Sequence, residues 1–140
     1  AAMTSSPNCG AKIAIAAGEY GWDDTAQLRL LSEGAVDVLQ VDATRCLGTT
    51  GFLQVAAVCD AFQRPLSAHC APALHTPLMC AVRPALHLEW FHDHARIERL
   101  AFDGVPVLVN GAASPDLTRP GNGLELREQD LRGYRVWSST

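Results

Sequence analysis

Four short apolar runs along this chain each end in an acidic residue or a histidine, and their spacing constrains the fold more than any other feature. The runs cover residues 13–18, 36–41, 65–68 and 86–88. The residues that end them are Glu19, Asp42, His69 and Glu89. These four are separated by 23, 27 and 20 residues. A β/α unit takes roughly 30 residues, and (β/α) barrels carry catalytic groups at the carboxyl ends of several strands. The pattern predicts an α/β fold with four polar groups on one rim, the parts of a metal-assisted proton-abstraction site.

Helical patterns fill the gaps between these runs. Residues 25–32 follow Asp23 and Asp24, either of which is a credible N-cap. Residues 48–51 open a second helix, in which apolar side chains recur at i, i+3, i+4 and i+7. Residues 73–83 form a third. Alternation of strand and helix through the fourth apolar run predicts right-handed crossovers and a parallel sheet.

The character of the chain changes after the fourth run. Residues 96–102 and 105–109 read as short strands, with Asp103-Gly104 as the turn between them. Residues 110–123, rich in Gly, Pro, Ser and Asn, predict a loop. Residues 125–131 predict a short helix. We expect this tail to be a cap and not a further β/α unit.

Four parallel strands are half of a closed barrel. We therefore expect residues 1–95 to be a partial (β/α) barrel holding its last four strands. Residues 96–140 would be a C-terminal extension that packs on the barrel or on a missing N-terminal capping domain. A half-barrel leaves two edge strands with unpaired backbone groups. Three explanations stay open: the rest of the barrel is missing, a partner or an oligomer covers the opening, or the sheet is an open, doubly wound one.

Composition and charge exclude several classes of protein. A length of 140 residues indicates one domain, and a hydrophobic content of 48% argues against disorder. The net charge of −4 gives no electrostatic reason to expect nucleic acid or an anionic membrane as a partner. No apolar run reaches the roughly 20 residues of a membrane span. The first seven residues lack the features of a secretory signal.

Cysteine usage bears on the compartment. The five cysteines are odd in number, and no two have C-x-x-C spacing, which favours reduced thiols in the cytoplasm over disulfides or structural zinc. Cys59 and Cys80 fall in helical patterns, and we expect both to behave as small core residues.

Asp42 and His69 lie at the ends of adjacent predicted strands. A carboxylate that hydrogen-bonds one imidazole nitrogen fixes the tautomer and raises the basicity of the other nitrogen, so His69 is a candidate general base. The alternative is structural, with His69 bonded to a backbone carbonyl and Asp42 capping the turn that follows its strand.

The two glutamates are candidates for different roles. Glu19 follows a glycine at a strand end, where it could be a ligand of Mg²⁺, which takes one or two carboxylates together with water and substrate oxygens. Glu89 stands between Leu88 and Trp90, where it could be held protonated and donate a hydrogen bond to developing negative charge. The alternatives are a solvated charge for Glu19 and an ion pair with Arg83 or Arg96 for Glu89.

Other polar motifs carry less weight. His92-Asp93-His94 has metal-binding residue types, but such a stretch is more often simply polar. His75 and His87 have ordinary structural interpretations. Gly48-Thr-Thr-Gly51 could hold an anion at a helix N-terminus, but it lacks the lysine of a P-loop, so nucleotide binding is not expected.

Several motifs, in order, resemble the C-terminal barrel of the enolase superfamily, and most closely the mandelate racemase subgroup with its acid-sugar dehydratases. The resemblance covers about residues 11–136. It rests on Gly18-Glu-Tyr20, Leu39-Gln-Val-Asp-Ala-Thr-Arg45 with Gly48-Thr-Thr-Gly51, Ser67-Ala-His69 with Pro72, His87-Leu-Glu-Trp-Phe91, Phe102-Asp-Gly104, and Pro120-Gly-Asn-Gly-Leu-Glu125. It implies the last four strands of a TIM-barrel-like fold.

The resemblance also implies a role for each matching residue. Glu19 matches the last of three acidic Mg²⁺ ligands. Asp42 and His69 match a dyad whose histidine moves the proton α to a carboxylate, and Glu89 matches the acid that hydrogen-bonds the enediolate. The implied reaction is magnesium-dependent dehydration or racemisation of a small carboxylate substrate such as an acid sugar. A cation and a hydrogen-bond donor suit this chemistry because the intermediate is a dianion.

The chain also departs from the family pattern. The two earlier metal-ligand strands, the lysine motif of an early strand and the N-terminal α+β domain have no counterpart here, and the only lysine is Lys12. We therefore expect the isolated chain to be inactive or nearly so. Two other hypotheses stay open: a non-catalytic fragment or interaction module derived from such a barrel, and an unrelated open α/β binding domain.

Overall fold

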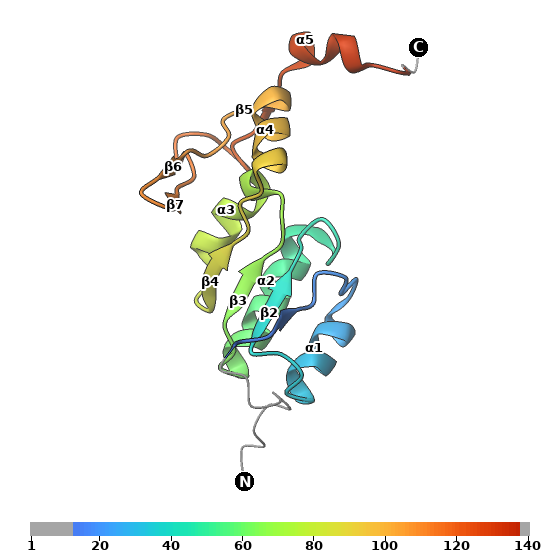
Figure 1. The fold of residues 1–140 in the computed structure, drawn as a ribbon, viewed down its shortest axis with the longest axis vertical. Helices are drawn as coiled ribbons and strands as arrows, with labels where there is room; N and C mark the ends of the chain where they lie inside the picture. The colour runs from blue at the N-terminus through green and yellow to red at the C-terminus, as the bar shows by residue number, and fades with distance from the viewer. Residues whose placement is uncertain (1–12, 138–140) are drawn as a thin grey trace.

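Four parallel strands form the central sheet of the protein, and they lie side by side in chain order (Figure 1). The computed structural model describes residues 13–137, so Cys9, Lys12 and the first seven residues lie outside it. The strands are β1 (Ala16–Ala17), β2 (Val38–Val41), β3 (Leu66–Ala68) and β4 (Ala85–Leu88). This arrangement confirms the predicted parallel sheet. An unbroken order is that of a barrel segment, since a doubly wound sheet reverses direction at a switch point.

Three helices cover one face of this sheet: α1 (Asp24–Ser32), α2 (Gly48–Ala61) and α3 (Pro72–Ala81). They confirm the three predicted helices to within two residues at either end. Asp23 is the N-cap of α1, and its side chain accepts a hydrogen bond from the Ala26 amide at 2.9 Å.

The core lies between the helices and alternate residues of the strands. Leu39, Val41, Leu66 and Ala68 point into it from the sheet, and Phe52, Val55 and Cys59 meet them from α2. Because all seven are almost fully buried, this layer is the main source of hydrophobic stabilisation. Cys59 is a core residue as predicted, whereas the prediction for Cys80 was wrong because its position on α3 faces solvent.

A fourth helix, α4 (His92–Ala101), follows β4 where the sequence predicted a strand over residues 96–102. The prediction failed because Asp103-Gly104 suggested a hairpin after this segment, although Ile97, Leu100 and Ala101 recur with a helical period. Only Ala95 of this helix is buried. Glu98 ties α4 to α3: its carboxylate accepts hydrogen bonds from the Ala73 amide at 3.1 and 3.2 Å. The fourth β/α unit is therefore complete, and position 95/96, the predicted boundary of the extension, falls inside this helix.

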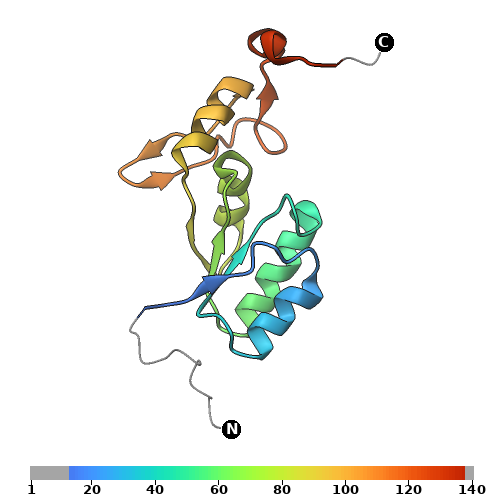
Figure 2. The same ribbon diagram turned by 45° about the vertical axis from the view of Figure 1, so that its right-hand side comes forward.

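Most of the remaining described residues lie beyond the carboxyl end of the sheet (Figure 2), whereas Leu108 and residues 111–113 border a cavity beside β4. This part of the chain consists of two small antiparallel pairs and two short helical turns. One pair joins β5 (Phe102–Asp103) to β8 (Glu125–Leu126), and the other joins β6 (Leu108–Val109) to β7 (Ala112–Ala113). They are followed by α5 (Glu128–Leu131) and the 3₁₀ turn η1 (Arg132–Tyr134).

This part differs from the sequence prediction in detail. The hairpin turn is Asn110-Gly111, not Asp103-Gly104, and both of its residues have the positive φ angles that a tight hairpin needs. The predicted helix over residues 125–131 gives its first two residues to β8 instead. No helix within residues 13–137 is long and apolar enough to cross a lipid bilayer.

Candidate active site

Three of the four predicted rim residues lie on the same face at the carboxyl end of the sheet. Val41, Ala68 and Leu88 point into the helix-side core, so Asp42, His69 and Glu89, which directly follow them, turn to the opposite face. Two backbone hydrogen bonds of 2.9 Å extend the ladder to this level, from the His69 amide to the Val41 carbonyl and from the Glu89 amide to the Ala68 carbonyl. The strands thus fix the backbone beneath the site.

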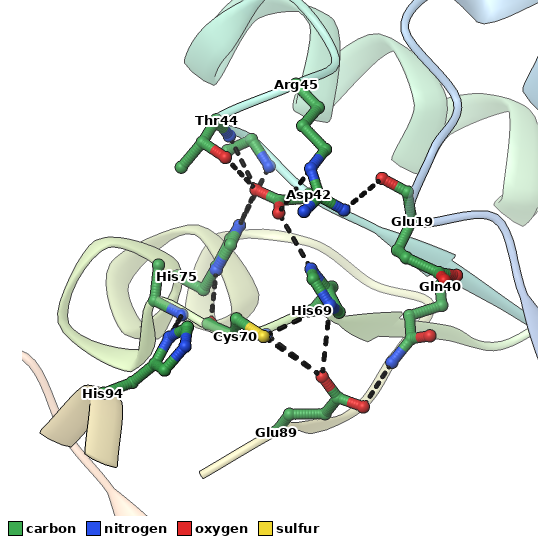
Figure 3. Close-up of polar contacts among 12 residues, drawn as sticks. Glu19, Gln40, Asp42, Thr44, Arg45, His69, Cys70, His75, Glu89 and His94 are labelled. Atoms are coloured by element: carbon green, nitrogen blue, oxygen red, sulfur yellow. Dashed lines mark hydrogen bonds and ion pairs between the residues drawn. The ribbon is translucent and has the colours of Figure 1, made fainter. Parts of the chain in front are cut away.

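Asp42 and His69 form the predicted pair, with 2.9 Å between Asp42 Oδ2 and His69 Nδ1 (Figure 3). Asp42 is almost fully buried, and its Oδ1 also accepts hydrogen bonds from the amide and the hydroxyl of Thr44 at 2.8 and 2.7 Å. Burial alone would raise the pKa of Asp42, but the hydrogen bonds from His69 and Thr44 outweigh it and the pKa lies below its usual value. An ionised Asp42 holds the proton on Nδ1 and leaves the lone pair of Nε2 for chemistry.

Glu89 is held by Gln40, a residue that the sequence analysis overlooked. Gln40 Nε2 donates to Glu89 Oε1 at 2.6 Å, and the Cys70 amide donates to Oε2 at 3.2 Å. Glu89 Oε2 lies 3.9 Å from His69 Nε2 (Figure 3). The alternative for Glu89, an ion pair with Arg83 or Arg96, was wrong: Arg83 pairs with Asp60 on α2, and Arg96 makes no ion pair with Glu89 in the described chain. The period of two along β2 could have revealed Gln40, since it stands two residues before Asp42 and shares its face.

His75 is a buried residue that connects two turns of the site. It is completely buried, its Nε2 accepts a hydrogen bond from the Ala43 amide at 2.9 Å, and its Nδ1 lies 2.8 Å from the Cys70 carbonyl oxygen. This pattern needs a neutral ring with its proton on Nδ1. Burial lowers the pKa of His75, which favours that neutral form. His75 thereby joins the turn after Asp42 to the turn after His69, a role that no sequence pattern indicated.

Arg45 connects the residues that follow β1 to Asp42. Its guanidinium donates to the Glu19 carbonyl oxygen at 3.1 Å, stacks over the Tyr20 ring at 4.5 Å and approaches Asp42 Oδ2 at 3.6 Å. Glu19 is half-buried and lies two residues beyond β1. Its role as a metal ligand stays a prediction. Within residues 13–137, Glu19 does not belong to any group of three potential metal ligands, so these residues do not complete a magnesium site.

The remaining motifs have different surroundings. His92, Asp93 and His94 open α4 and, with His69, Cys70 and Phe91, line a cavity of about 540 Å³. The polar stretch therefore borders the rim.

Packing requires a glycine at position 51, because a Cβ there would lie 1.6 Å from the Cys46 carbonyl oxygen. That contact explains the glycine without an anion.

Comparison with known proteins places this geometry in context. The family model described as Enolase C-terminal domain-like matches residues 4–130. A curated D-gluconate dehydratase from Thermoproteus tenax is 35% identical over 128 residues, which cover 87% of this chain and 26% of that protein. The chain thus spans about a quarter of the length of this relative.

Solved structures give the same result. A mandelate racemase/muconate lactonizing enzyme-like protein from Rubrobacter xylanophilus is 52% identical, with a TM-score of 0.79 over 84% of this chain and 32% of that one. An enolase from Bradyrhizobium, solved with magnesium and mandelic acid, is 26% identical, with a TM-score of 0.78 over 91% of this chain and 34% of that one. The chain spans about a third of each.

Proposed function

Because the chain belongs to the Enolase C-terminal domain-like family, we propose that it forms one side of the active site of a magnesium-dependent acid-sugar dehydratase or racemase. The reaction begins with removal of the proton α to a carboxylate. The observation that carries this proposal is the 2.9 Å hydrogen bond between Asp42 and His69 at the ends of adjacent parallel strands.

His69 is the proposed base. Asp42 accepts the Nδ1 proton, so Nε2 carries the lone pair and takes the proton from the α-carbon. The charge that then forms on the imidazolium is balanced by Asp42, whose lowered pKa keeps it ionised. Asp42 therefore orients His69 and stabilises its protonated form.

Glu89 is the proposed hydrogen-bond donor to the enediolate, a role that requires its carboxyl group to carry a proton. Its carboxyl group lies within 3.9 Å of His69 Nε2, so both groups can reach one small substrate. Gln40 and the Cys70 amide fix its orientation before substrate binds. Such preorganised groups act where charge develops, without a reorganisation cost at the moment of reaction.

Glu19 is the proposed ligand of Mg²⁺ from this chain, on the rim edge formed by β1. The cation would stabilise the negative charge of the substrate carboxylate. The further ligands would come from strands that pair with the open edge of β1. Magnesium is present in the Bradyrhizobium structure, which supports this assignment for the family.

The complete active site requires more of the barrel than these four units, so we propose that the isolated chain is inactive or nearly so. The D-gluconate dehydratase relative supports an acid sugar as the substrate.

A second candidate function is that of a non-catalytic interaction module. It is favoured by the open edges of β1 and β4, each of which has a strand neighbour on one side only among the described residues.

A chimera tests the proposal. This chain would replace the matching third of the Rubrobacter protein, and exchange of the substrate α-proton with deuterium would be followed by NMR with Mg²⁺ and a panel of acid sugars. We expect exchange in the chimera and none in the isolated chain. His69→Asn should lower the exchange rate by about 10²–10⁴-fold. Gln54→Asn, at an exposed position on α2 and away from the rim, is the control. If exchange persists in His69→Asn at the face of the α-carbon next to residue 69, His69 is not the base.

A further inference from the structure

A histidine, a cysteine and a glutamate converge at one point of the rim. His69 Nε2 lies 3.2 Å from Cys70 Sγ, Cys70 Sγ lies 3.7 Å from Glu89 Oε2, and Glu89 Oε2 lies 3.9 Å from His69 Nε2. Figure 3 shows the three side chains pointing toward one another from the ends of β3 and β4. Within residues 13–137 this is the one group of three potential ligands close enough to hold a single ion.

These separations are close to those of a tetrahedral zinc site. Zinc lies about 2.3 Å from a cysteine sulfur and about 2.0–2.2 Å from histidine nitrogen or carboxylate oxygen. Tetrahedral angles then put ligand atoms about 3.3–3.6 Å apart. The three distances in the structure bracket that range, so small side-chain rotations are enough to form the site.

The three ligands are already oriented by neighbours. Asp42 holds the proton of His69 on Nδ1, which leaves Nε2 with the lone pair that a metal needs. Gln40 donates to Glu89 Oε1, the oxygen that faces away from the thiol. His75 hydrogen-bonds the Cys70 carbonyl oxygen. A carboxylate behind a ligating histidine is the usual outer contact of zinc sites.

We propose that His69, Cys70 and Glu89 form a binding site for Zn²⁺ or another thiophilic divalent ion, distinct from the magnesium site proposed for Glu19. Sulfur ligands select zinc over magnesium, which prefers oxygen. The ion forms a bond to Cys70 Sγ and releases the thiol proton to solvent, while His69 binds as neutral imidazole and Glu89 as carboxylate. The fourth position opens on the cavity of about 540 Å³, where a water completes the tetrahedron.

The site rests on geometry and donor chemistry, not on the proposed reaction. If the proposed function is also correct, the ion inhibits it, because the lone pair that binds zinc is the one that takes the substrate proton. Metal binding is measured on the isolated chain and proton exchange on the chimera, so either proposal can fail without the other.

Titration of the 140-residue chain with Co²⁺, an optical substitute for Zn²⁺, tests the site. We expect one equivalent to bind, with visible bands of a tetrahedral ion and a near-ultraviolet thiolate-to-cobalt charge-transfer band. One equivalent of Zn²⁺ should abolish both signals, whereas a large excess of Mg²⁺ should not. Absence of the thiolate band, or displacement by Mg²⁺ at comparable concentration, would overturn the proposal.

Three variants locate the bound ion. Cys70→Ser should remove the charge-transfer band. Glu89→Gln should keep the band while weakening Co²⁺ binding by at least the roughly 10–100-fold that loss of an outer contact of a metal site costs. Cys80→Ser is the matched control because Cys80 is exposed on α3, away from the rim, and it should bind as the parent does. Circular dichroism confirms that each variant is folded. A band that survives in folded Cys70→Ser, or unchanged affinity in folded Glu89→Gln, would place the ion elsewhere and refute the site.

Discussion

His75 and Cys70 are joined by a 2.8 Å hydrogen bond between the imidazole Nδ1 and the Cys70 carbonyl oxygen. The other ring nitrogen accepts from the Ala43 amide, so one buried side chain connects the turns that carry Asp42 and His69. His75→Ala leaves both backbone groups without this partner and opens a cavity. We expect a loss of about 2–4 kcal/mol in the free energy of unfolding, measured with urea. His87→Ala, at an exposed site, should stay within about 0.5 kcal/mol of the parent.

The stability of the chain should depend on pH in two windows. Burial lowers the pKa of His75 in the folded state, so the unfolded chain binds more protons below about pH 6.5 and stability falls as pH drops from there. The lowered pKa of Asp42 adds a second loss below about pH 4. Urea titrations from pH 8 to pH 3 measure both. The His75→Gln variant should no longer lose stability below about pH 6.5 but should still lose it below about pH 4. If this variant still loses stability below about pH 6.5, another group is responsible.

Gln40→Leu should disturb Glu89 without removing it. The variant loses the 2.6 Å hydrogen bond that joins β2 to the residue after β4. Because this hydrogen bond is only partly buried, we expect the free energy of unfolding to fall by about 1 kcal/mol. In the chimera, kcat should fall about tenfold with a small change in KM, since Glu89 then has to be ordered during the reaction. Gln54→Leu on the exposed side of α2 is the control. An unchanged kcat would mean that Gln40 does not position Glu89.

Gly51→Ala tests the close packing at the start of α2. The added Cβ would lie 1.6 Å from the Cys46 carbonyl oxygen, so the backbone must move, and we expect a loss of about 3 kcal/mol or more. Gly34→Ala is the comparison. Gly34 has a φ of +62° and open space around it, so only backbone strain of about 1–2 kcal/mol applies. Equal losses in the two variants, measured by thermal unfolding, would contradict the packing argument.

The first half of the fold could be predicted because short apolar runs alternate regularly with helical segments there. Strand ends followed by polar residues, and helices with a broad apolar stripe, located the sheet, α1, α2 and α3 as well as the Asp42–His69 pair. The helix α4 was predicted as a strand although Ile97, Leu100 and Ala101 recur with a helical period. There the Asp103-Gly104 pair suggested a hairpin that Asn110-Gly111 makes instead.

The supporting residues of the site were harder to predict than its rim. Asp42 and Glu89 are marked by the strands that precede them, and Gln40 follows from the same alternation. His75 is different, because its position beneath Asp42 depends on how α3 rotates against β2 and β3. Local sequence does not encode that rotation, so a buried histidine on a helix reads as an ordinary polar residue.

The left-handed backbone at Cys70 and Ala71, with φ of 52° and 36°, limits which residues can replace them in evolution. Glycine and asparagine adopt such angles at little cost, whereas valine, isoleucine and threonine do so with severe strain. A saturation library at these two codons should therefore retain small and flexible residues and lose the β-branched ones. A lineage that discards the thiol would do so through glycine, asparagine or serine, without disturbing the turn that presents His69.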